Sequence, residues 1–339
     1  KNNSKKHFVC LFGKTYSILV VINNQNGNTN NRKIINNIKP FIAYKLDINK
    51  GNTPILYYCN GTQYIKPNHR IPNKPVNHIR LVSFGCTHEF HEQLFIPNGD
   101  ILIHCGDVCN WRRYDNTIER FKNEYQVWQH FVTEYLKKYT HNNFKYGVYI
   151  MPGNHDIFCL KNWNYVNRLL YDNIPHSRLI CNNLMNINIE NRKVLSIFGS
   201  PVSWYRSKPS NAYQIHRNET KHLTWYHDQR RYKYTTSQYF NKYFPKRHVD
   251  ILFTHGGPYL NIDHHGSNDL LYYIKRYQPQ FALSADTHSR YGLYNINPTK
   301  LFHVSIAHDK ARYLDIIKRG VIIIDIDMNT LNDYKSYNR

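Results

Sequence analysis

The feature that most limits the fold of this chain is a series of short apolar runs that begins at residue 79. Uninterrupted runs of this kind are typical of strands that are buried on both faces of a sheet. Helical periodicity occurs between some of them, at residues 118–135 and 267–278. Strands that alternate with helices predict an α/β architecture. The runs cover residues 79–84, 100–105, 147–151, 193–198, 250–255, 280–285, 301–307 and 321–327.

The start of the chain differs from this pattern. Residues 8–22 and 54–65 have the composition of β-strands, whereas residues 23–37 are an asparagine-rich polar stretch that predicts a loop. We therefore expect an N-terminal extension whose strands pack onto a main domain, followed by a polar C-terminal tail. The bounds of these three parts are residues 1–78, 79–327 and 328–339.

Five of the apolar runs are followed by side chains that can bind a metal ion. Ligands in open α/β sheets bind outside the carboxyl ends of the strands, so these side chains are expected to meet. One such coincidence carries little weight, but five in sequence order are hard to obtain by chance. The groups are Cys86-Thr87-His88, Gly106-Asp107, Gly153-Asn154-His155-Asp156, His255-Gly256-Gly257 and Asp286-Thr287-His288.

These positions give the chain a family resemblance. It resembles the calcineurin-like metallophosphoesterases in HCGDVCN (104–110), PGNHD (152–156), FTHGGP (253–258) and SADTH (284–288). It is also similar to the subfamily of metallophosphoesterase-domain-containing brain and fetal phosphodiesterases, in PNGDILIHCGD (97–107), FGSPVSW (198–204), VDILFTHGGP (249–258) and SRYG (289–292). The resemblance covers about residues 79–327. It implies the metallo-dependent phosphatase fold, a four-layer α/β/β/α sandwich with two mixed β-sheets.

The resemblance also implies a role for each residue of the site. Asp107 would bridge two metal ions, because one carboxylate oxygen can lie between two cations. His155 would contact the phosphate, together with Asn154, and would protonate the leaving oxygen. A histidine that titrates near neutral pH suits such an acid. The ligands implied for the first metal are Cys86, His88, Asp107 and His288, and those for the second are Asp107, Asn154, His255 and Asp286.

Two of these ligand positions depart from the family pattern. Cys86 stands where the family has an aspartate, and Asp286 stands where it has a histidine. A thiolate is softer than a carboxylate and favours zinc or iron over manganese or magnesium. We therefore expect two divalent metal ions, zinc or iron by preference, with manganese as a further candidate. In the alternative, Cys86 does not coordinate, and the first site keeps His88, Asp107 and His288.

The function predicted in this way is that of a metallophosphoesterase. We expect a phosphodiesterase of low activity on small phosphodiesters such as cyclic nucleotides, although the substrate class rests on the resemblance alone. The alternative is a pseudoenzyme or binding module that recognises a phosphorylated ligand, a nucleic acid or an acidic partner. Retention of His155 favours the enzyme, because a pure binding module needs no leaving-group acid. The two substituted ligands favour the binding module.

Composition bears on the partners and on the compartment. The formal net charge of +22 suggests affinity for phosphates, but lysine and arginine are spread along the chain and no nucleic-acid motif occurs. The seven cysteines form no CxxC pair, which favours a reducing compartment. The apolar run at residues 17–22 is too short to span a membrane. We therefore expect a cytoplasmic protein without a transmembrane segment, although a targeting segment could precede Lys1, which is not a methionine.

Overall fold

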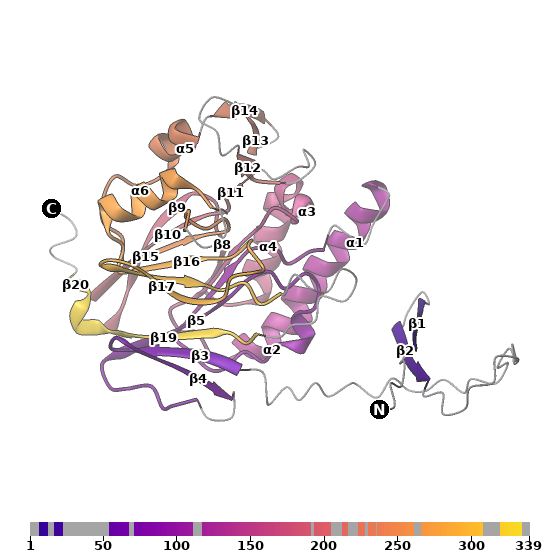
Figure 1. Cartoon of the computed structure of the whole chain (residues 1–339), viewed down its shortest axis with the longest axis horizontal. Helices are drawn as coiled ribbons and strands as arrows, with labels where there is room; N and C mark the ends of the chain where they lie inside the picture. Colours follow the sequence, from indigo (N-terminus) through magenta and orange to yellow (C-terminus); the bar gives the residue numbers. More distant parts are fainter. Residues whose placement is uncertain are drawn as a thin grey trace, which may run out of the picture. The chain divides into compact units, whose positions relative to one another are not determined.

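The chain forms two compact units, Lys1–Asn49 and Lys50–Arg339, in a computed structural model (Figure 1). In the first unit, β1 (His7–Phe12) pairs antiparallel with β2 (Ser17–Ile22), so the apolar stretch at residues 8–22 makes two strands. The asparagine-rich stretch at residues 23–37 lies outside the described residues. The described residues are 7–12, 17–22, 54–67, 71–110, 117–190, 193–204, 212–215, 223–227, 230–234, 236–260, 266–307 and 319–333.

The second unit contains two large mixed sheets (Figure 1). In the first, the strand order is β4-β3-β19-β5-β6-β7-β8. Strands β5 to β8 run parallel to one another, and β19 joins β5 in the antiparallel direction. These strands are β3 (Pro54–Cys59), β4 (Thr62–Pro67), β5 (His78–Phe84), β6 (Ile101–Cys105), β7 (Val148–Met151), β8 (Ser177–Leu179) and β19 (Ile322–Asp327).

The second sheet has the order β17-β18-β16-β15-β10-β20, and β9 also pairs with β10. Its central strands β10, β15, β16 and β18 are parallel. The strands are β9 (Asn183–Asn188), β10 (Lys193–Ser200), β15 (Ile251–Thr254), β16 (Phe281–Ser284), β17 (Gly292–Ile296), β18 (Thr299–His303) and β20 (Asn332–Asp333). Two small pairs are β11 (Ser203–Trp204) with β12 (Gln214–Ile215), and β13 (Leu223–His227) with β14 (Arg230–Tyr234).

Helices connect many of these strands. The predicted helix at residues 118–135 is α1, which continues directly into a π-helix (Phe131–Leu136). The predicted helix at residues 267–278 is α6, which begins where the Ser267 hydroxyl accepts a hydrogen bond from the Leu270 N–H. The α-helices are α1 (Thr117–His130), α2 (Lys137–Thr140), α3 (Ile157–Lys161), α4 (Trp163–Asn173), α5 (Thr236–Tyr243) and α6 (Asn268–Tyr277); His91–Gln93 and Met328–Thr330 are 3₁₀-helices.

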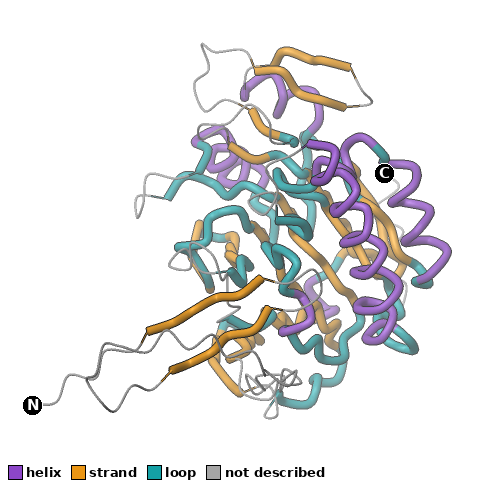
Figure 2. Tube along the Cα trace, turned by 90° about the vertical axis from the view of Figure 1, so that its right-hand side faces the viewer, coloured by secondary structure: helices purple, strands orange, loops and turns teal. Residues whose placement is uncertain are grey.

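Three apolar layers separate the sheets and helices. Successive side chains of a strand point to opposite faces, so a strand covered on both faces must be apolar throughout. Along β5, Ile79 and Leu81 pack between the two sheets, whereas Val82 and Phe84 pack under α1 and α4. A third layer lies between the second sheet and helices α5 and α6. Helices accordingly flank the strands on both sides in Figure 2. The predicted α/β fold, with two mixed sheets between helical layers, is confirmed.

A buried ion pair ties the first hairpin of the second unit to the main sheet. The Arg80 guanidinium on β5 donates to both carboxylate oxygens of Asp325 on β19, with distances of 2.8 and 2.7 Å. The Tyr57 hydroxyl on β3 donates to the same carboxylate at 2.8 Å. Residues 54–67 are therefore part of the same sheet as β5. The domain boundary expected at residue 78 stays a prediction.

Two further expectations concern the environment of the protein. None of the helices in the described ranges combines the length and the apolar character that crossing a membrane requires. Free thiols are found at Cys59, Cys86, Cys105, Cys109, Cys159 and Cys181. The cytoplasmic location stays a prediction.

Candidate metal centre

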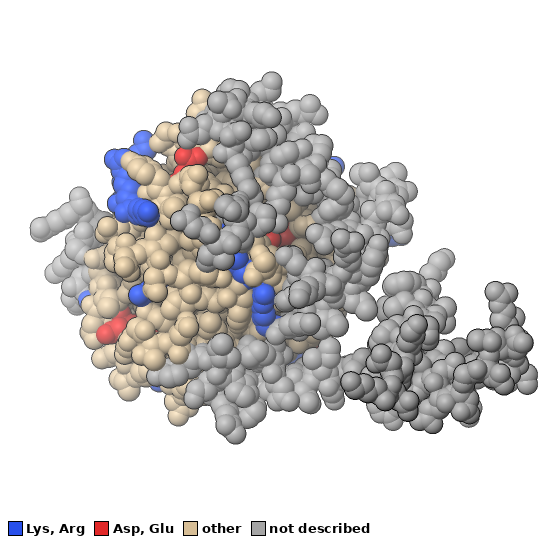
Figure 3. Space-filling model, viewed as in Figure 1, with Lys and Arg blue, Asp and Glu red and all other residues tan. Residues whose placement is uncertain are grey.

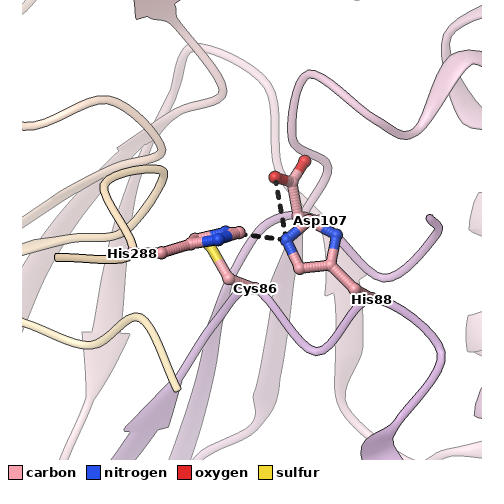
Figure 4. A group of neighbouring side chains, drawn as sticks. All are labelled: Cys86, His88, Asp107 and His288. Carbon is pink, nitrogen blue, oxygen red and sulfur yellow. Dashed lines mark hydrogen bonds and ion pairs between the residues drawn. The ribbon is translucent and has the colours of Figure 1, made fainter. Parts of the chain in front are cut away.

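Four of the predicted ligands converge beyond the carboxyl ends of their strands (Figure 4). Cys86 and His88 follow β5, Asp107 follows β6, and His288 follows β16, so the group draws on both sheets. One ligand atom from each of the four lies within 4.8 Å of the others, and all four residues are buried. The structure thus brings together residues that are 200 positions apart in the sequence, such as His88 and His288.

Within this first group the histidines and the carboxylate are close enough to share a cation. The His88 Nε2 atom lies 2.9 Å from His288 Nε2 and 3.7 Å from Asp107 Oδ2. The Cys86 sulfur accepts a hydrogen bond from the Asp286 N–H at 3.2 Å. Cys86 is therefore placed in the turn where the family has its aspartate, with its sulfur at the same cluster.

A second group surrounds His255, which follows β15. Its Nε2 atom lies 3.2 Å from Asp107 Oδ2, 2.9 Å from Asn154 Oδ1 and 3.9 Å from Asp286 Oδ1. Asp107 therefore belongs to both groups, as expected of a bridging carboxylate. All eight residues predicted for the site lie in or beside these two groups, while their roles as ligands stay proposals.

The orientation of two histidine rings is fixed by backbone carbonyls. His88 Nδ1 lies 3.1 Å from the Cys109 carbonyl oxygen, and His255 Nδ1 lies 2.7 Å from that of Cys105. A carbonyl oxygen can only accept, so Nδ1 donates in each ring, and in the neutral ring Nε2 carries the lone pair. This second hydrogen bond is typical of histidines that bind metal through the other nitrogen. The His88 and His288 nitrogens, 2.9 Å apart, also need a proton or a cation to hold them together. The residues present therefore fit a bound metal ion.

The electrostatics of the centre favour positive charge. Burial would raise the pKa of the Asp107 carboxyl, but His255, His155 and His88 hold it well below its usual range. Burial would likewise lower the pKa of His255, but Asp107 and Asp286 raise it to about 9. Asp107 is thus an anion in a fully buried position, and a bound cation would replace the proton on His255.

The thiol of Cys86 is in a different state. Burial raises its pKa well above the usual range, and the Asp107 and Asp286 carboxylates add to this effect. Without a cation beside it, Cys86 is therefore a neutral thiol. Coordination through sulfur requires the metal to displace this proton, which makes binding at the first group dependent on pH.

His155 lies at the entrance of the centre. Its Nε2 atom is 3.8 Å from Asp107 Oδ2, and its ring packs edge-on against that of His88 with centroids 5.0 Å apart. The His155 backbone N–H donates to the other Asp107 oxygen at 2.9 Å. The side chain is 10% exposed, compared with 2% for His88. Its position suits contact with a ligand that enters from solvent.

The backbone at the centre is held in an uncommon conformation. Cys86, His88, Asp107 and Asp286 have positive φ angles of 55°, 44°, 62° and 60°. For residues other than glycine, this left-handed region costs about 1–2 kcal/mol each. Such strain is concentrated at functional sites, where the surrounding structure enforces it. Strained turns therefore aim these four side chains at one place.

Two glycines make the close packing of the loops feasible. A side chain on Gly106, whose φ is +94°, would place its Cβ 2.5 Å from His255 Nδ1. A Cβ on Gly153 would collide with the Asp107 carboxylate. The glycines in the two motifs are thus required by the approach of one loop to the other.

Asp156 has a structural role that the motif alone did not reveal. Its buried carboxylate accepts hydrogen bonds from the N–H groups of Gly153, Asp107, Val108 and Cys109, at 2.7, 3.0, 3.3 and 2.9 Å. It therefore fixes the loop that carries Asp107 against the loop that carries His155. The only signal in the sequence was its place at the end of PGNHD.

Replacement of Asp156 tests this role. Asp156→Asn is expected to lower the free energy of unfolding by about 2 kcal/mol, because an amide nitrogen cannot accept from N–H groups. Urea unfolding measures the change. The control is Asp172→Asn on the exposed side of α4, which should stay within about 0.5 kcal/mol. Equal small effects of both substitutions would show that Asp156 does not hold the loops.

A separate group of His91, Glu92 and His130 also has metal-binding chemistry. His91 Nε2 lies 3.2 Å from His130 Nδ1. A metal-bound histidine normally donates its second N–H to a partner. The buried Nδ1 atom of His91 has no hydrogen-bond partner within the described residues. We therefore assign no metal to this group.

The fold, with metal-binding side chains at the carboxyl edges of two facing sheets, defines the class of metallophosphoesterases. Residues 78–290 match the family described as calcineurin-like phosphoesterase, and the chain belongs to this family. It is similar to a UPF0046 protein of Caenorhabditis elegans, with 24% identity over 229 residues that cover 66% of this chain and 68% of the relative. Among solved structures, the crystal structure of TT1561 of Thermus thermophilus is 11% identical and covers 76% of this chain and 96% of its own, with a TM-score of 0.37.

Proposed function

We propose that this protein is a metal-dependent phosphodiester hydrolase of low activity that acts on small phosphodiesters such as cyclic nucleotides. The observation that carries the proposal is the position of Asp107, whose Oδ2 atom lies 3.2 Å from His255, 3.7 Å from His88 and 3.8 Å from His155. One buried carboxylate thus joins two sets of ligands and the proposed acid. Membership of the phosphoesterase family supports hydrolysis and divalent metal ions in general.

The residues that would hold the metal ions fall into two overlapping sets. Cys86, His88, Asp107 and His288 would hold the first ion, and Asp107, Asn154, His255 and Asp286 the second. When bound, two such cations supply Lewis-acid chemistry that neutralises phosphate charge and lowers the pKa of water. Because Cys86 offers sulfur, zinc or iron is the expected metal at the first position, with manganese as an alternative.

The side chains around the ions bind the phosphate and move the proton. The Asn154 amide and the His155 ring would contact phosphate oxygens. His155 would donate its proton to the oxygen of the departing alcohol, since an alkoxide is a poor leaving group at neutral pH. The His155 Nε2 atom lies 3.8 Å from Asp107 Oδ2, so its ring is next to the shared ligand of the centre.

The binding-module alternative rests on the state of Cys86. A cation at the first group must displace the proton of a buried thiol whose pKa is well above its usual range. If the free-energy cost of removing this proton prevents metal binding, the first group stays without a metal ion. The chain would then recognise a phosphorylated ligand without cleaving it. The experiments below distinguish the two functions.

The leaving-group dependence of hydrolysis tests the role of His155. The whole 339-residue chain, loaded in turn with zinc, iron and manganese, is assayed with cyclic AMP and with bis(4-nitrophenyl) phosphate. His155→Ala should lower kcat for cyclic AMP by about 100-fold or more, the range of general acid catalysis. The loss should be much smaller for the nitrophenyl ester, whose leaving group needs no proton. Equal losses on both substrates would exclude the acid role, and no hydrolysis of either by the wild type with any metal would favour the binding module.

Substitution of Cys86 tests the metal preference. Cys86→Asp restores the carboxylate of the family pattern and should raise activity with manganese by about tenfold, because manganese prefers oxygen ligands. Activity with zinc should change little. Cys105→Ser alters another buried thiol, on β6, and is the matched control, expected to leave the metal preference unchanged. Unchanged or lower manganese activity in Cys86→Asp would show that the thiolate is integral to the centre.

A further inference from the structure

Basic side chains gather at one end of the helical layer formed by α5 and α6. Figure 3 shows a large blue area over α6 on the face that it displays. The exposed residues of this region include Lys246 and Arg247 in the loop after α5, and Lys275 and Arg276 in the last turn of α6. Lys242, at the end of α5, is also exposed. We call these five residues the α5–α6 basic surface.

Within the described residues, the absence of an ion pair distinguishes three cations of the α5–α6 basic surface from some, but not all, basic side chains of the second unit. Elsewhere, Lys145 pairs with Glu190 at 2.6 Å and Arg168 pairs with Asp172 at 3.4 Å. Lys246, Lys275 and Arg276 form no ion pair with a carboxylate among the residues that the structure describes. The helix dipole favours cations in the last turn of a helix, which explains why Lys275 and Arg276 occur at the end of α6. Lys246 lies outside the helix and has no such explanation.

A small hollow lies between the two helices within this surface. Its volume is about 110 Å³, and Lys246 and Arg276 both line it. The aromatic rings of Tyr272 and Tyr277 line it as well, and the single carboxylate in its lining is that of Asp269 in the first turn of α6. Tyr272 is 62% exposed, and its hydroxyl accepts a hydrogen bond from Arg276 at 3.0 Å. The hollow thus combines two cations with an exposed aromatic ring.

The surface is separate from the candidate metal centre. Helix α6 begins next to Ser267, which bridges to Pro258 in the loop that follows His255. Lys275 and Arg276 lie near the other end of this ten-residue helix, about 12 Å further along its axis. The cations are thus directed to a partner outside the metal centre, and the inference is independent of the proposed function.

We propose that the α5–α6 basic surface binds the backbone of a single-stranded nucleic acid. Lys246 and Arg276 would hold one phosphate at the hollow, and Lys275 a neighbouring one. The exposed ring of Tyr272 would stack on an unpaired base, an interaction that tolerates any sequence. A duplex offers no free base face to this ring, and an anionic membrane would attract the cations but would give the ring no base on which to stack.

Fluorescence anisotropy of a labelled twelve-residue oligouridylate tests the proposal on the whole chain, with a gel to show that the probe stays intact. The triple variant Lys246→Ser, Lys275→Ser and Arg276→Ser should bind on the order of 100-fold more weakly at 0.1 M salt, and the slope of log affinity against log salt should fall by about 2. Tyr272→Ala should weaken binding by about tenfold, the effect of one lost stacking contact.

A charge-matched variant separates a defined surface from overall charge. Lys122→Ser, Lys137→Ser and Lys138→Ser remove three exposed lysines from α1 and α2 and should change the affinity less than about threefold, if the contacts are local. Circular dichroism confirms that both triple variants are folded. Equal weakening by the two variants, no binding by the wild type, or binding to phosphatidylserine vesicles without binding to the oligonucleotide would each overturn the proposal.

Discussion

Asp107→Asn is expected to reduce phosphodiester hydrolysis by at least about 1000-fold, equivalent to about 4 kcal/mol in the activation barrier. The substitution keeps the size of the side chain but removes the negative charge shared by both ligand groups. Asp107 Oδ2 faces His255, His88 and His155 within 3.8 Å. Both metal ions would therefore bind more weakly. Steady-state kinetics on bis(4-nitrophenyl) phosphate measure the change.

Asp100 is the matched control for this experiment. It also follows a glycine in the sequence, but it precedes β6, where it accepts a hydrogen bond from the Arg80 N–H at 2.8 Å and pairs with Lys74. Asp100→Asn should therefore retain kcat within about threefold in the folded protein, since Asp100 lies at the opposite end of β6 from Asp107. If Asp107→Asn retained a tenth of the activity or more, the shared carboxylate would not be the basis of catalysis.

The second large effect concerns stability. Asp325→Asn is expected to lower the free energy of unfolding by about 3–5 kcal/mol, the usual cost of breaking a buried ion pair on one side. The Asp325 carboxylate is fully buried, and both of its oxygens bind the Arg80 guanidinium. The substitution leaves the Arg80 charge buried without its counter-charge, and the Tyr57 hydroxyl loses an anionic acceptor. Urea unfolding followed by circular dichroism measures the loss.

A neighbouring aspartate provides the control. Asp327 ends the same strand and accepts a hydrogen bond from the Asn329 N–H at 2.9 Å as the cap of a short 3₁₀-helix. Asparagine caps helices about as well as aspartate, so Asp327→Asn should cost less than about 0.5 kcal/mol. A loss below about 1 kcal/mol for Asp325→Asn would mean that Arg80 finds another partner and that the pair does not join β3, β5 and β19.

The sheet strands were the most predictable part of the fold. Strands such as β6 and β15 are covered on both faces, and their uninterrupted apolar runs signal this directly. The edge strand β9 was missed because its sequence NLMNIN alternates asparagine with apolar residues and only one of its positions is buried. Residues 8–22 were predicted to form β-strands, and two strands are found there. An apolar pattern indicates burial, so it does not identify strands that lie at the surface.

The candidate site was predictable in its members but not in its geometry. Parallel strands end at one edge of a sheet, so residues after each strand could be expected to meet. The left-handed turns at Cys86 and Asp286 could not be predicted, since only the packing around them enforces such strain. The four hydrogen bonds to Asp156, and the carbonyls that orient His88 and His255, likewise depend on loops brought together by the fold. The same is true of the α5–α6 basic surface, which depends on how these two helices pack together.

The metal content of the purified protein tests the central claim most directly. After incubation with zinc and removal of excess metal, mass spectrometry should find two equivalents per chain, because in the proposed centre Asp107 is shared by the group around His88 and the group around His255. His88→Ala and His255→Ala should each reduce the content to about one equivalent, since each removes a ligand from one set only. One equivalent or less in the wild type, under zinc, iron and manganese alike, would contradict a centre of two metal ions built around Asp107.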